Sequence, residues 1–268
     1  METGITEQTI IHVSDLHFGP PYVEKVGDAI VQLVEELSPD VVAVSGDLTQ
    51  RARVSQFRAA RAFLNRLPAH CAQVVVPGNH DIPLYRIWER LFSPYRLFKK
   101  FISPHRNSVH RGEGLTVVGI DSTHFYRRLK GGKIRKKHLD FCADAFANSP
   151  ESDFRVVVFH HPLFALTEEV NHDQVLVRSL RSMGVQLVLC GHVHESLIYH
   201  FPKEQGQPSM SVVLCGTSSS SRGRSSEEGA NSLNVIRLTK EHVSISRRVY
   251  DSSYNSFGEV EQQSFPRA

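Results

Sequence analysis

The sequence contains no run of about 18 apolar residues, so we expect no membrane-spanning helix. Its start, METGITEQTI, lacks a basic segment followed by an apolar one, so it does not resemble a secretory signal. The few cysteines have neither the spacing of a metal knuckle nor that of a redox pair; they are Cys71, Cys142, Cys190 and Cys215. We therefore expect buried free thiols in a reducing compartment and predict a cytoplasmic protein.

The net charge is also small, at +3 over 268 residues, which argues against a protein that coats nucleic acid. We expect no stable nucleic-acid complex. The positive charge is uneven, because the stretch RRLKGGKIRKK, residues 127–137, carries seven basic residues and no acid. A solvated loop would explain this stretch, and so would a lip that attracts an anionic substrate.

What the sequence does contain is a regular alternation of apolar runs and helical periodicity. Continuous runs of valine and isoleucine are typical of strands buried on both faces, and the segments between them show an apolar helix face. The pattern predicts strands at 9–14, 40–45, 73–77, 115–120, 154–159 and 185–190, and helices at 24–37, 54–67, 136–147 and 173–182. Such an alternation indicates sheets covered by helices.

Two further regions have a different character. The tail contains alternating short runs, at 209–216, 232–238 and 242–250, which favour antiparallel strands, with a polar and mobile loop at 217–231. Residues 84–106 are irregular, since prolines at 94 and 104 break any long helix. No fixed-period repeat is present, and we predict one domain over 1–268 with two packed sheets and a possible cap at 84–106.

The cap segment combines apolar and basic side chains. Its large apolar residues could stack a base, hold acyl chains, or simply pack on the sheets; they are Trp88, Leu91, Phe92, Tyr95, Phe98 and Phe101. The interleaved arginines and lysines would also suit an anionic lipid surface, so membrane contact through 84–106 stays open. The sequence does not indicate an oligomeric state.

Polar residues of one chemical kind follow five predicted strands. They are Asp15 and His17, Asp47, Asn79 with His80 and Asp81, His160 and His161, and His192 and His194. Singly, each aspartate has an ordinary explanation as a turn residue and each histidine as a satisfied core or surface residue. Ligands bind beyond the carboxyl ends of strands in open α/β sheets, so together these residues predict one converging site.

The spacing of these residues suits metal ions. In an extended or tightly turned segment residues i and i+2 project to the same side, so Asp15 and His17 can reach one ion, as can His192 and His194. Carboxylate, imidazole and amide ligands suit Mn²⁺, Fe²⁺/Fe³⁺ or Zn²⁺, and the absence of cysteine from the set argues against a structural zinc site. Aspartates can bridge two divalent metal ions about 3.5–4 Å apart, an arrangement that serves displacement at phosphorus.

The motifs DLH, GDLT, GNHD, HHP and GHVH, in this order, resemble the calcineurin-like metallophosphoesterase family. The match spans residues 10–194, and its details look closest to the bacterial class III cyclic-nucleotide phosphodiesterases. The resemblance implies an α/β (α+β) fold, a four-layer sandwich of two mixed β-sheets flanked by helices.

The resemblance also implies roles for the individual residues. Asp15, His17 and His194 would hold one metal ion, Asn79, His160 and His192 the other, and Asp47 would bridge both. His80 would face the phosphate as a catalytic residue, and Asp81 would orient it. His161 would lie behind the ligands near the substrate, and Arg222 and Arg224 are further candidates for binding it.

The function expected from this site is a phosphodiesterase that hydrolyses small substrates such as cyclic nucleotides by a metal-activated hydroxide. One alternative is a hydrolase of lipid-linked pyrophosphate or phosphodiester substrates, served by the cap. A nuclease and a phosphomonoesterase are further alternatives. A catalytically idle scaffold is opposed by the complete ligand set.

Overall fold

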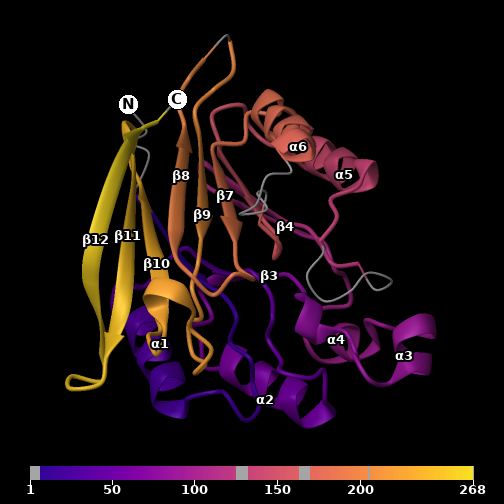
Figure 1. Ribbon diagram of the computed structural model, residues 1–268. Helices are drawn as coiled ribbons and strands as arrows, with labels where there is room; N and C mark the ends of the chain where they lie inside the picture. Colours follow the sequence, from indigo (N-terminus) through magenta and orange to yellow (C-terminus); the bar gives the residue numbers. More distant parts are fainter. Residues whose placement is uncertain (1–6, 125–131, 163–169, 205, 268) are drawn as a thin grey trace.

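The computed structural model describes residues 7–124, 132–162, 170–204 and 206–267. Two six-stranded sheets pack face to face, and helices cover the outer face of each (Figure 1). The four-layer sandwich of two mixed sheets predicted from the sequence is confirmed.

The first sheet combines parallel and antiparallel pairs. β1, β2 and β3 run parallel, whereas β10, β11 and β12 join β1 through antiparallel pairs. Its strands, in spatial order, are β12 (Ser256–Pro266), β11 (His242–Asp251), β10 (Ser232–Leu238), β1 (Gln8–Val13), β2 (Val41–Val44) and β3 (Ala72–Val75).

The second sheet is parallel at its centre and antiparallel at both edges. In spatial order its strands are β4 (Ser108–Gly112), β5 (Leu115–Gly119), β6 (Phe154–Val158), β7 (Leu187–Cys190), β9 (Met210–Leu214) and β8 (Leu197–Phe201). Of the tail strands predicted as antiparallel, β10 and β11 are so on both sides, whereas β9 runs parallel to β7 and antiparallel to β8.

Each central strand is apolar on both faces because each face has a partner layer. In β2, Val41 and Ala43 lie in the core between the sheets, whereas Val42 and Val44 pack toward the helices. Full burial of a valine contributes about 1.5–3 kcal/mol, which explains the unbroken apolar runs. The first sheet is covered by α1 (Glu24–Leu37) and α2 (Val54–Leu64), the second by α5 (Lys136–Ala147) and α6 (Val170–Ser182).

The segment 84–106 forms two short helices that differ in packing. α3 (Ile87–Phe92) has no buried residue, and Trp88 and Phe92 are 75% and 78% exposed. In α4 (Arg96–Phe101), by contrast, Leu97 and Phe98 are buried against the first core. The simple packing explanation therefore holds for α4 and does not hold for α3.

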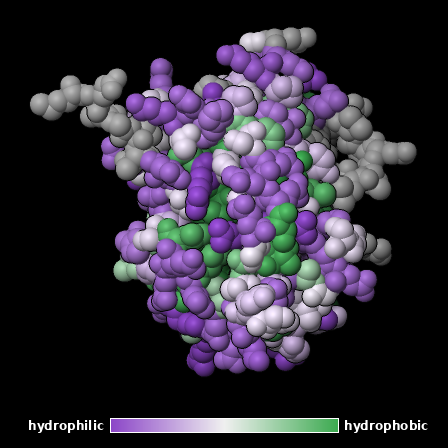
Figure 2. All heavy atoms as spheres, turned by 90° about the vertical axis from the view of Figure 1, so that its left-hand side faces the viewer, coloured by the Kyte–Doolittle hydropathy of each residue, from purple (hydrophilic) through white to green (hydrophobic). Residues whose placement is uncertain are grey.

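Edge strands account for most of the secondary structure that the sequence did not indicate. β4, β8 and β12 have few fully buried residues, so they lack the apolar runs of the central strands. On the side of β12 the surface is mostly hydrophilic, with hydrophobic side chains in small separate groups (Figure 2). Polar edge strands of this kind discourage pairing with other chains.

The prediction of a mobile loop over 217–231 is wrong for its first part. Thr217, Ser218, Ser219 and Ser220 are fully buried. The hydroxyl groups of Thr217, Ser218 and Ser219 form hydrogen bonds to the chain that follows β1, and that of Ser220 pairs with Thr217. The polar composition here therefore reflects a buried hydrogen-bonded turn. The loop also contains a short 3₁₀ helix, η2 (Ser225–Glu227).

Two smaller expectations concern membrane spans and cysteines. Among the described residues, no helix combines the length and the apolar character that a bilayer crossing requires. All four cysteines are buried and free, as predicted. Residues 127–131 of the basic stretch lie outside the described residues, and its last two lysines begin α5.

Candidate metal centre

The polar residues after the five strands meet where the carboxyl ends of the two sheets face each other. β1, β2 and β3 bring them from the first sheet, and β6 and β7 bring them from the second. η1 (Asn79–Asp81) follows β3 directly and presents its residues as a short 3₁₀ helix. The parallel arrangement predicted from the alternation of strands and helices therefore explains why residues up to 179 positions apart become neighbours, as in Asp15 and His194.

One group of donors consists of Asp15, His17, Asp47 and His194, all buried, with donor atoms within 4.8 Å of one another. His194 Nε2 lies 3.0 Å from Asp15 Oδ1 and 3.1 Å from His17 Nε2. His17 Nε2 lies 3.8 Å from Asp47 Oδ2. Two carboxylates and two imidazoles thus point at one small volume.

A second group forms beside the first. Asn79 Oδ1 lies 3.0 Å from His160 Nε2 and 2.9 Å from His192 Nδ1. His160 Nε2 lies 3.5 Å from Asp47 Oδ1. Asp47 therefore directs one carboxylate oxygen to each group, which is the geometry of a bridging ligand.

The donor set fits two divalent cations. Ligands bound to one ion at about 2.1 Å are separated from one another by roughly 3 Å, which is the spacing of these atoms. Asp15 Oδ1 and His17 Nδ1 are also buried without a hydrogen-bond partner among the described residues. Buried polar atoms in native proteins are normally satisfied, so an unsatisfied carboxylate oxygen inside a ring of imidazoles supports a cation site.

The electrostatics of the two groups point the same way. Burial would lower the pKa of His160, but the charge and hydrogen bond of Asp47 outweigh it and raise that pKa to about 9. Burial likewise opposes protonation of His194, and Asp15 raises its pKa overall. By contrast, burial followed by the charge of His160 lowers the pKa of His192 to about 4. The carboxylates therefore attract positive charge, and a metal ion would compete with protons for His160 and His194.

The backbone at these positions is strained. The φ angles of Asp15, His17, Asp47, His192 and His194 are 52°, 50°, 50°, 76° and 62°. Side chains other than glycine rarely adopt this left-handed region, and each such residue costs roughly 1–3 kcal/mol. A cluster of strained residues of this kind is typical of functional sites and is not expected for a set of ordinary turns.

Two glycines permit the close approach of the ligand loops. A side chain on Gly78 would collide with the Asp47 carboxylate, and one on Gly191 would collide with Ser14 and Asp15. These glycines precede Asn79 and His192 in the sequence, where either could have been an ordinary turn residue. In the structure they allow one loop to pass directly over the next.

Hydrogen bonds from side chains and from the backbone hold the candidate ligands in orientation. Ser14 Oγ donates to Asp15 Oδ2 at 2.6 Å, and the His192 N–H donates to the same oxygen at 2.9 Å. His160 Nδ1 donates to the Ser45 carbonyl at 2.8 Å, which leaves Nε2 free to face Asn79 and Asp47. Such partners fix the tautomer and the ring plane of a metal-binding histidine.

The buried 217–220 segment supports the loop after β1. The Ser14 N–H donates to Ser218 Oγ at 3.0 Å, and Thr217 Oγ1 donates to the Asp15 carbonyl at 2.8 Å. Ser219 Oγ donates to the Leu16 carbonyl at 3.3 Å. Sequence reasoning missed these residues, because nothing in a serine-rich loop indicates burial; only its position after the apolar run of β9 could have suggested it.

The expected role of Asp81 differs from what its hydrogen bonds show. Its buried carboxylate accepts from the backbone N–H groups of Leu48, Thr49 and Gly78 and from Thr49 Oγ1, at 2.8–3.1 Å. The His80 ring is instead oriented by the Gln50 carbonyl, 2.9 Å from Nδ1. Asp81 therefore connects η1 to the loop after β2 and forms none of the hydrogen bonds described for the His80 imidazole.

His161 lies beside the second group of donors. Its Nδ1 is 2.9 Å from Ser122 Oγ, and its Nε2 is buried without a hydrogen-bond partner in the described part of the chain. The ring packs against His160 and His192, with centroids 4.9 and 4.7 Å away. Burial, followed by the charges of these two rings, holds its pKa well below the usual range. His160 is the better ligand candidate, because its Nε2 faces both Asn79 and Asp47.

The two candidate arginines lie at the rim. The Arg222 carbonyl accepts from His194 Nδ1 at 2.7 Å, and the Arg222 guanidinium donates to Gln50 Oε1 at 2.9 Å. Arg222 thereby links the first donor group to the residue that orients His80. Arg224 is exposed and approaches the site through its backbone N–H, 3.3 Å from the His194 carbonyl.

The family model of calcineurin-like phosphoesterases matches residues 8–196, which include every candidate metal ligand. The chain belongs to the calcineurin-like phosphoesterase family. This membership confirms the resemblance seen in the motifs. As a member of this family the protein is a metal-dependent phosphoester hydrolase. The family's dinuclear divalent metal centre agrees with the presence of two clusters of possible ligands, one formed by Asp15, His17, Asp47 and His194 and the other by His160, His161 and His192.

Sequence relatives support the same assignment, and a solved structure shows a similar fold. The chain is 27% identical to a cAMP/cGMP dual specificity phosphodiesterase of Mycobacterium tuberculosis, over 88% of this chain and 78% of that protein. It is 25% identical to the 3′,5′-cyclic adenosine monophosphate phosphodiesterase CpdA of Escherichia coli, over 72% of each. The purple acid phosphatase PPD1 of yellow lupin has a similar fold, with a TM-score of 0.70 and 12% identity over 98% of this chain and 54% of that one.

Proposed function

We propose that this phosphoesterase hydrolyses small phosphodiesters such as cyclic nucleotides at a dinuclear metal centre. The observation that carries the proposal is the pair of donor groups that share Asp47, one oxygen of which lies near each group. The names of the two bacterial relatives, both cyclic-nucleotide phosphodiesterases, support the substrate class.

In this proposal the ligands divide as the sequence predicts. Asp15, His17 and His194 would hold one ion, Asn79, His160 and His192 would hold the other, and Asp47 would contribute to both. When bound, two such ions would supply Lewis-acid charge at the phosphorus and bring the pKa of a coordinated water near 7. Mn²⁺, iron and Zn²⁺ all suit this mixed oxygen and nitrogen set.

His80 is the residue that we assign to the leaving oxygen. Its Nδ1 donates to the Gln50 carbonyl, so Nε2 is the ring atom that can carry a proton toward a substrate. Its ring lies edge-on to His17, with centroids 4.9 Å apart, so it sits beside the first donor group. We propose that His161 and the guanidinium groups of Arg222 and Arg224 contact substrate around this core.

A panel assay with Mn²⁺ tests the reaction class. The panel contains an aryl phosphodiester, an aryl phosphomonoester, cyclic nucleotides and a nucleotide-diphospho-lipid. We expect the highest rates on diesters, and a higher rate on the monoester than on every diester would overturn the proposal. Bound metal without turnover on any substrate would favour an idle scaffold. His80→Ala should retain both ions and lose roughly 10²–10⁴-fold in turnover.

The exposed surface of α3 favours a second candidate, a hydrolase of lipid-linked phosphodiesters or pyrophosphates at a membrane surface. Four large apolar side chains there are mostly exposed: Tyr85, Ile87, Trp88 and Phe92, at 64–78%. Arginines flank them at positions 86, 90 and 96. Arg86 and Arg96 share one ion-pair partner, Glu89, so this segment keeps a net positive charge that suits an anionic lipid surface.

Liposomes test this second candidate. A Trp88→Ser, Phe92→Ser variant would lose binding to anionic vesicles and keep its rate on the aryl diester. Equal vesicle binding by this variant and the parent protein would exclude the second candidate function.

The buried free cysteines also support a reducing compartment, and we propose the cytoplasm.

A further inference from the structure

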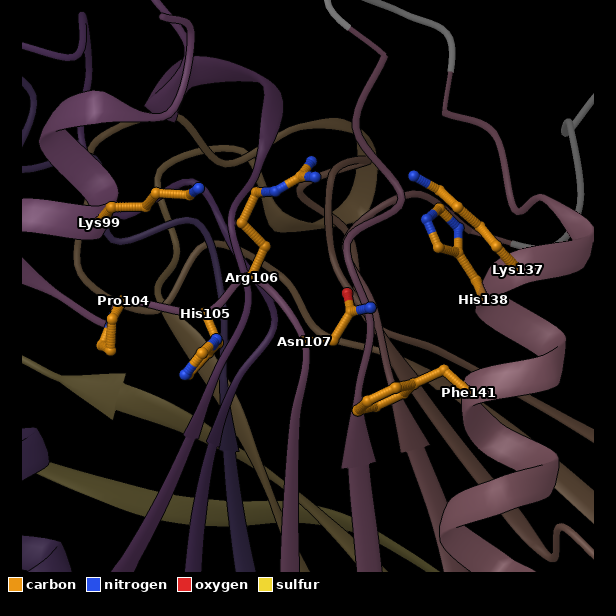
Figure 3. A pocket seen from close by; sticks show the side chains of 8 residues that line it. All are labelled: Lys99, Pro104, His105, Arg106, Asn107, Lys137, His138 and Phe141. Carbon is orange, nitrogen blue, oxygen red and sulfur yellow. The ribbon is translucent and has the colours of Figure 1, made fainter.

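A cavity of about 350 Å³ lies between α4, the segment 103–107 and α5, and none of its lining residues is a candidate metal ligand. It is lined by Lys99, Pro104, His105, Arg106, Asn107, Lys137, His138 and Phe141. Figure 3 shows the charged ends of Lys99, Arg106 and Lys137 gathered on one side, with Pro104 and Phe141 on the other. The cavity therefore has a cationic side and an apolar side.

The positive charge of this cavity is only partly neutralised. No carboxylate is among its eight lining residues. Arg106 forms an ion pair with Asp121, and its guanidinium lies over the Tyr95 ring at 4.2 Å, so its orientation is fixed. Within the described ranges Lys99 and Lys137 have no ion-pair partner, so two uncompensated ammonium groups face one cavity.

The pKa of His138, another lining residue, is affected by the same positive charges. Burial lowers the pKa of this imidazole first, and the charges of Lys137, Arg135 and Arg106 lower it further, against the opposing charge of Asp121. An anion in the cavity would relieve this accumulation of like charge.

The cavity is separate from the metal centre but shares a wall with it. Asp121, at the end of β5, pairs with Arg106 on the cavity side. The next residue, Ser122, contacts His161 on the metal side, with Oγ 2.9 Å from Nδ1. The scissile phosphate at the metals and an anion among the lysines would therefore occupy different places.

We propose that this cavity is a second binding site, for the dianionic phosphate of a small phosphomonoester such as a nucleoside monophosphate. Lysine ammonium groups bind phosphate as point charges, and a fixed arginine adds directional hydrogen bonds. A phosphomonoester carries up to two negative charges, whereas a phosphodiester carries one, so the cationic side selects the monoester. Phe141 and Pro104 offer an apolar surface to the remainder of the ligand.

Calorimetric titration of the metal-loaded protein with adenosine 5′-monophosphate tests the site. Lys99→Ala, Lys137→Ala removes the two free cations. Lys100→Ala, Lys136→Ala is the matched control, because it removes the adjacent lysines from the same two helices and changes the net charge equally. We expect the first variant to lose about tenfold in affinity for each lysine at one site, while the control binds as the parent protein does.

Further arms separate phosphate chemistry from nucleotide chemistry. Inorganic phosphate should bind the same site more weakly than the nucleotide, and Phe141→Ala should weaken the nucleotide alone. A non-hydrolysable analogue of 3′,5′-cyclic adenosine monophosphate, which the metal-loaded protein cannot convert to the monophosphate, should show little dependence on Lys99 and Lys137.

Equal binding by both double variants, or equal losses in both, would overturn the site. An equally strong lysine dependence for the cyclic nucleotide would overturn its selectivity for a dianion. Binding is read without turnover, so the result does not depend on the substrate proposed for the metal centre.

Discussion

The two donor groups of the metal centre are built differently. Asp15, His17 and His194 all have left-handed backbone, and the group includes a carboxylate in addition to Asp47. In the other group only His192 is left-handed, and the third ligand is the neutral amide of Asn79. The first group thus has more negative charge and more left-handed backbone than the second. The residues of the second group come from a 3₁₀ turn and from two strand ends. We infer that the first ion is bound more tightly.

Asp47 is shared by both groups, so its removal should have the largest effect. Asp47→Asn keeps the shape of the side chain but removes the charge that both ions share. We expect loss of both ions and a fall of roughly 10³-fold or more in diester turnover, measured by metal analysis and kinetics. If the variant retained one tightly bound ion, binding of that ion would not depend on the charge of Asp47.

Removing one ligand from each group should separate them. Asn79→Ala should lose only the second ion, whereas Asp15→Ala should lose the first and also the hydrogen bonds from Ser14 and His192. We expect turnover to fall by roughly 10²–10³-fold in both, with a lower melting temperature only for Asp15→Ala. Metal stoichiometry and thermal unfolding give the two readouts. If both variants lost the same number of ions and the same stability, the proposed difference between the two donor groups would be wrong.

The adjacent histidines allow a finer test of the second group. His160→Ala should abolish binding of the second ion, because its Nε2 faces Asn79 and Asp47. His161→Ala should keep that ion with an affinity reduced by about 10- to 100-fold, as for a residue that supports a ligand. Titration with Mn²⁺ measures both affinities. If only the His161 variant lost metal, the ligand assignment would be reversed.

A pH titration gives the smallest expected change. The pKa of His160 is raised to about 9, so below pH 9 a metal ion must displace a proton from this ring. Affinity for the second ion should therefore rise by about tenfold from pH 7 to pH 8, and by less as the pH approaches 9. Mn²⁺ binding measured at pH 7 and pH 8 in the parent protein checks this slope. A flat profile would mean that His160 is not the ring that exchanges its proton for metal.

Much of this centre could be predicted from the sequence because the central strands are marked by apolar runs. Each run ends at a polar motif, so the position of Asp47 after β2 and of His192 after β7 followed from the order of elements alone. The direction of a side chain within a turn does not follow from that order. The family resemblance predicts that Asp81 orients His80, whereas its carboxylate accepts hydrogen bonds from the Thr49 and Gly78 backbone.

The remaining misses have a common physical cause. Whether a polar segment is buried depends on which other segments pack over it. The local sequence around Thr217 and Ser218 indicates a solvent-exposed loop, but the loop after β1 covers them. Trp88 is the opposite case: its apolar side chain favours burial, but no other segment in the described part of the chain covers it and it is exposed. The cavity beside Phe141 is not evident from the sequence, because its lining residues come from three separate segments.

The support of the Asp15 loop by residues 217–220 limits how this chemistry could be transplanted. The family model ends at residue 196, and all the candidate ligands lie within it. A chimera that grafted only that stretch onto another scaffold would contain every donor atom but lack the hydroxyl groups that hold the Ser14–Leu16 backbone in place. Any functional graft must therefore extend at least through Ser219, whatever the motifs suggest about where the catalytic module stops.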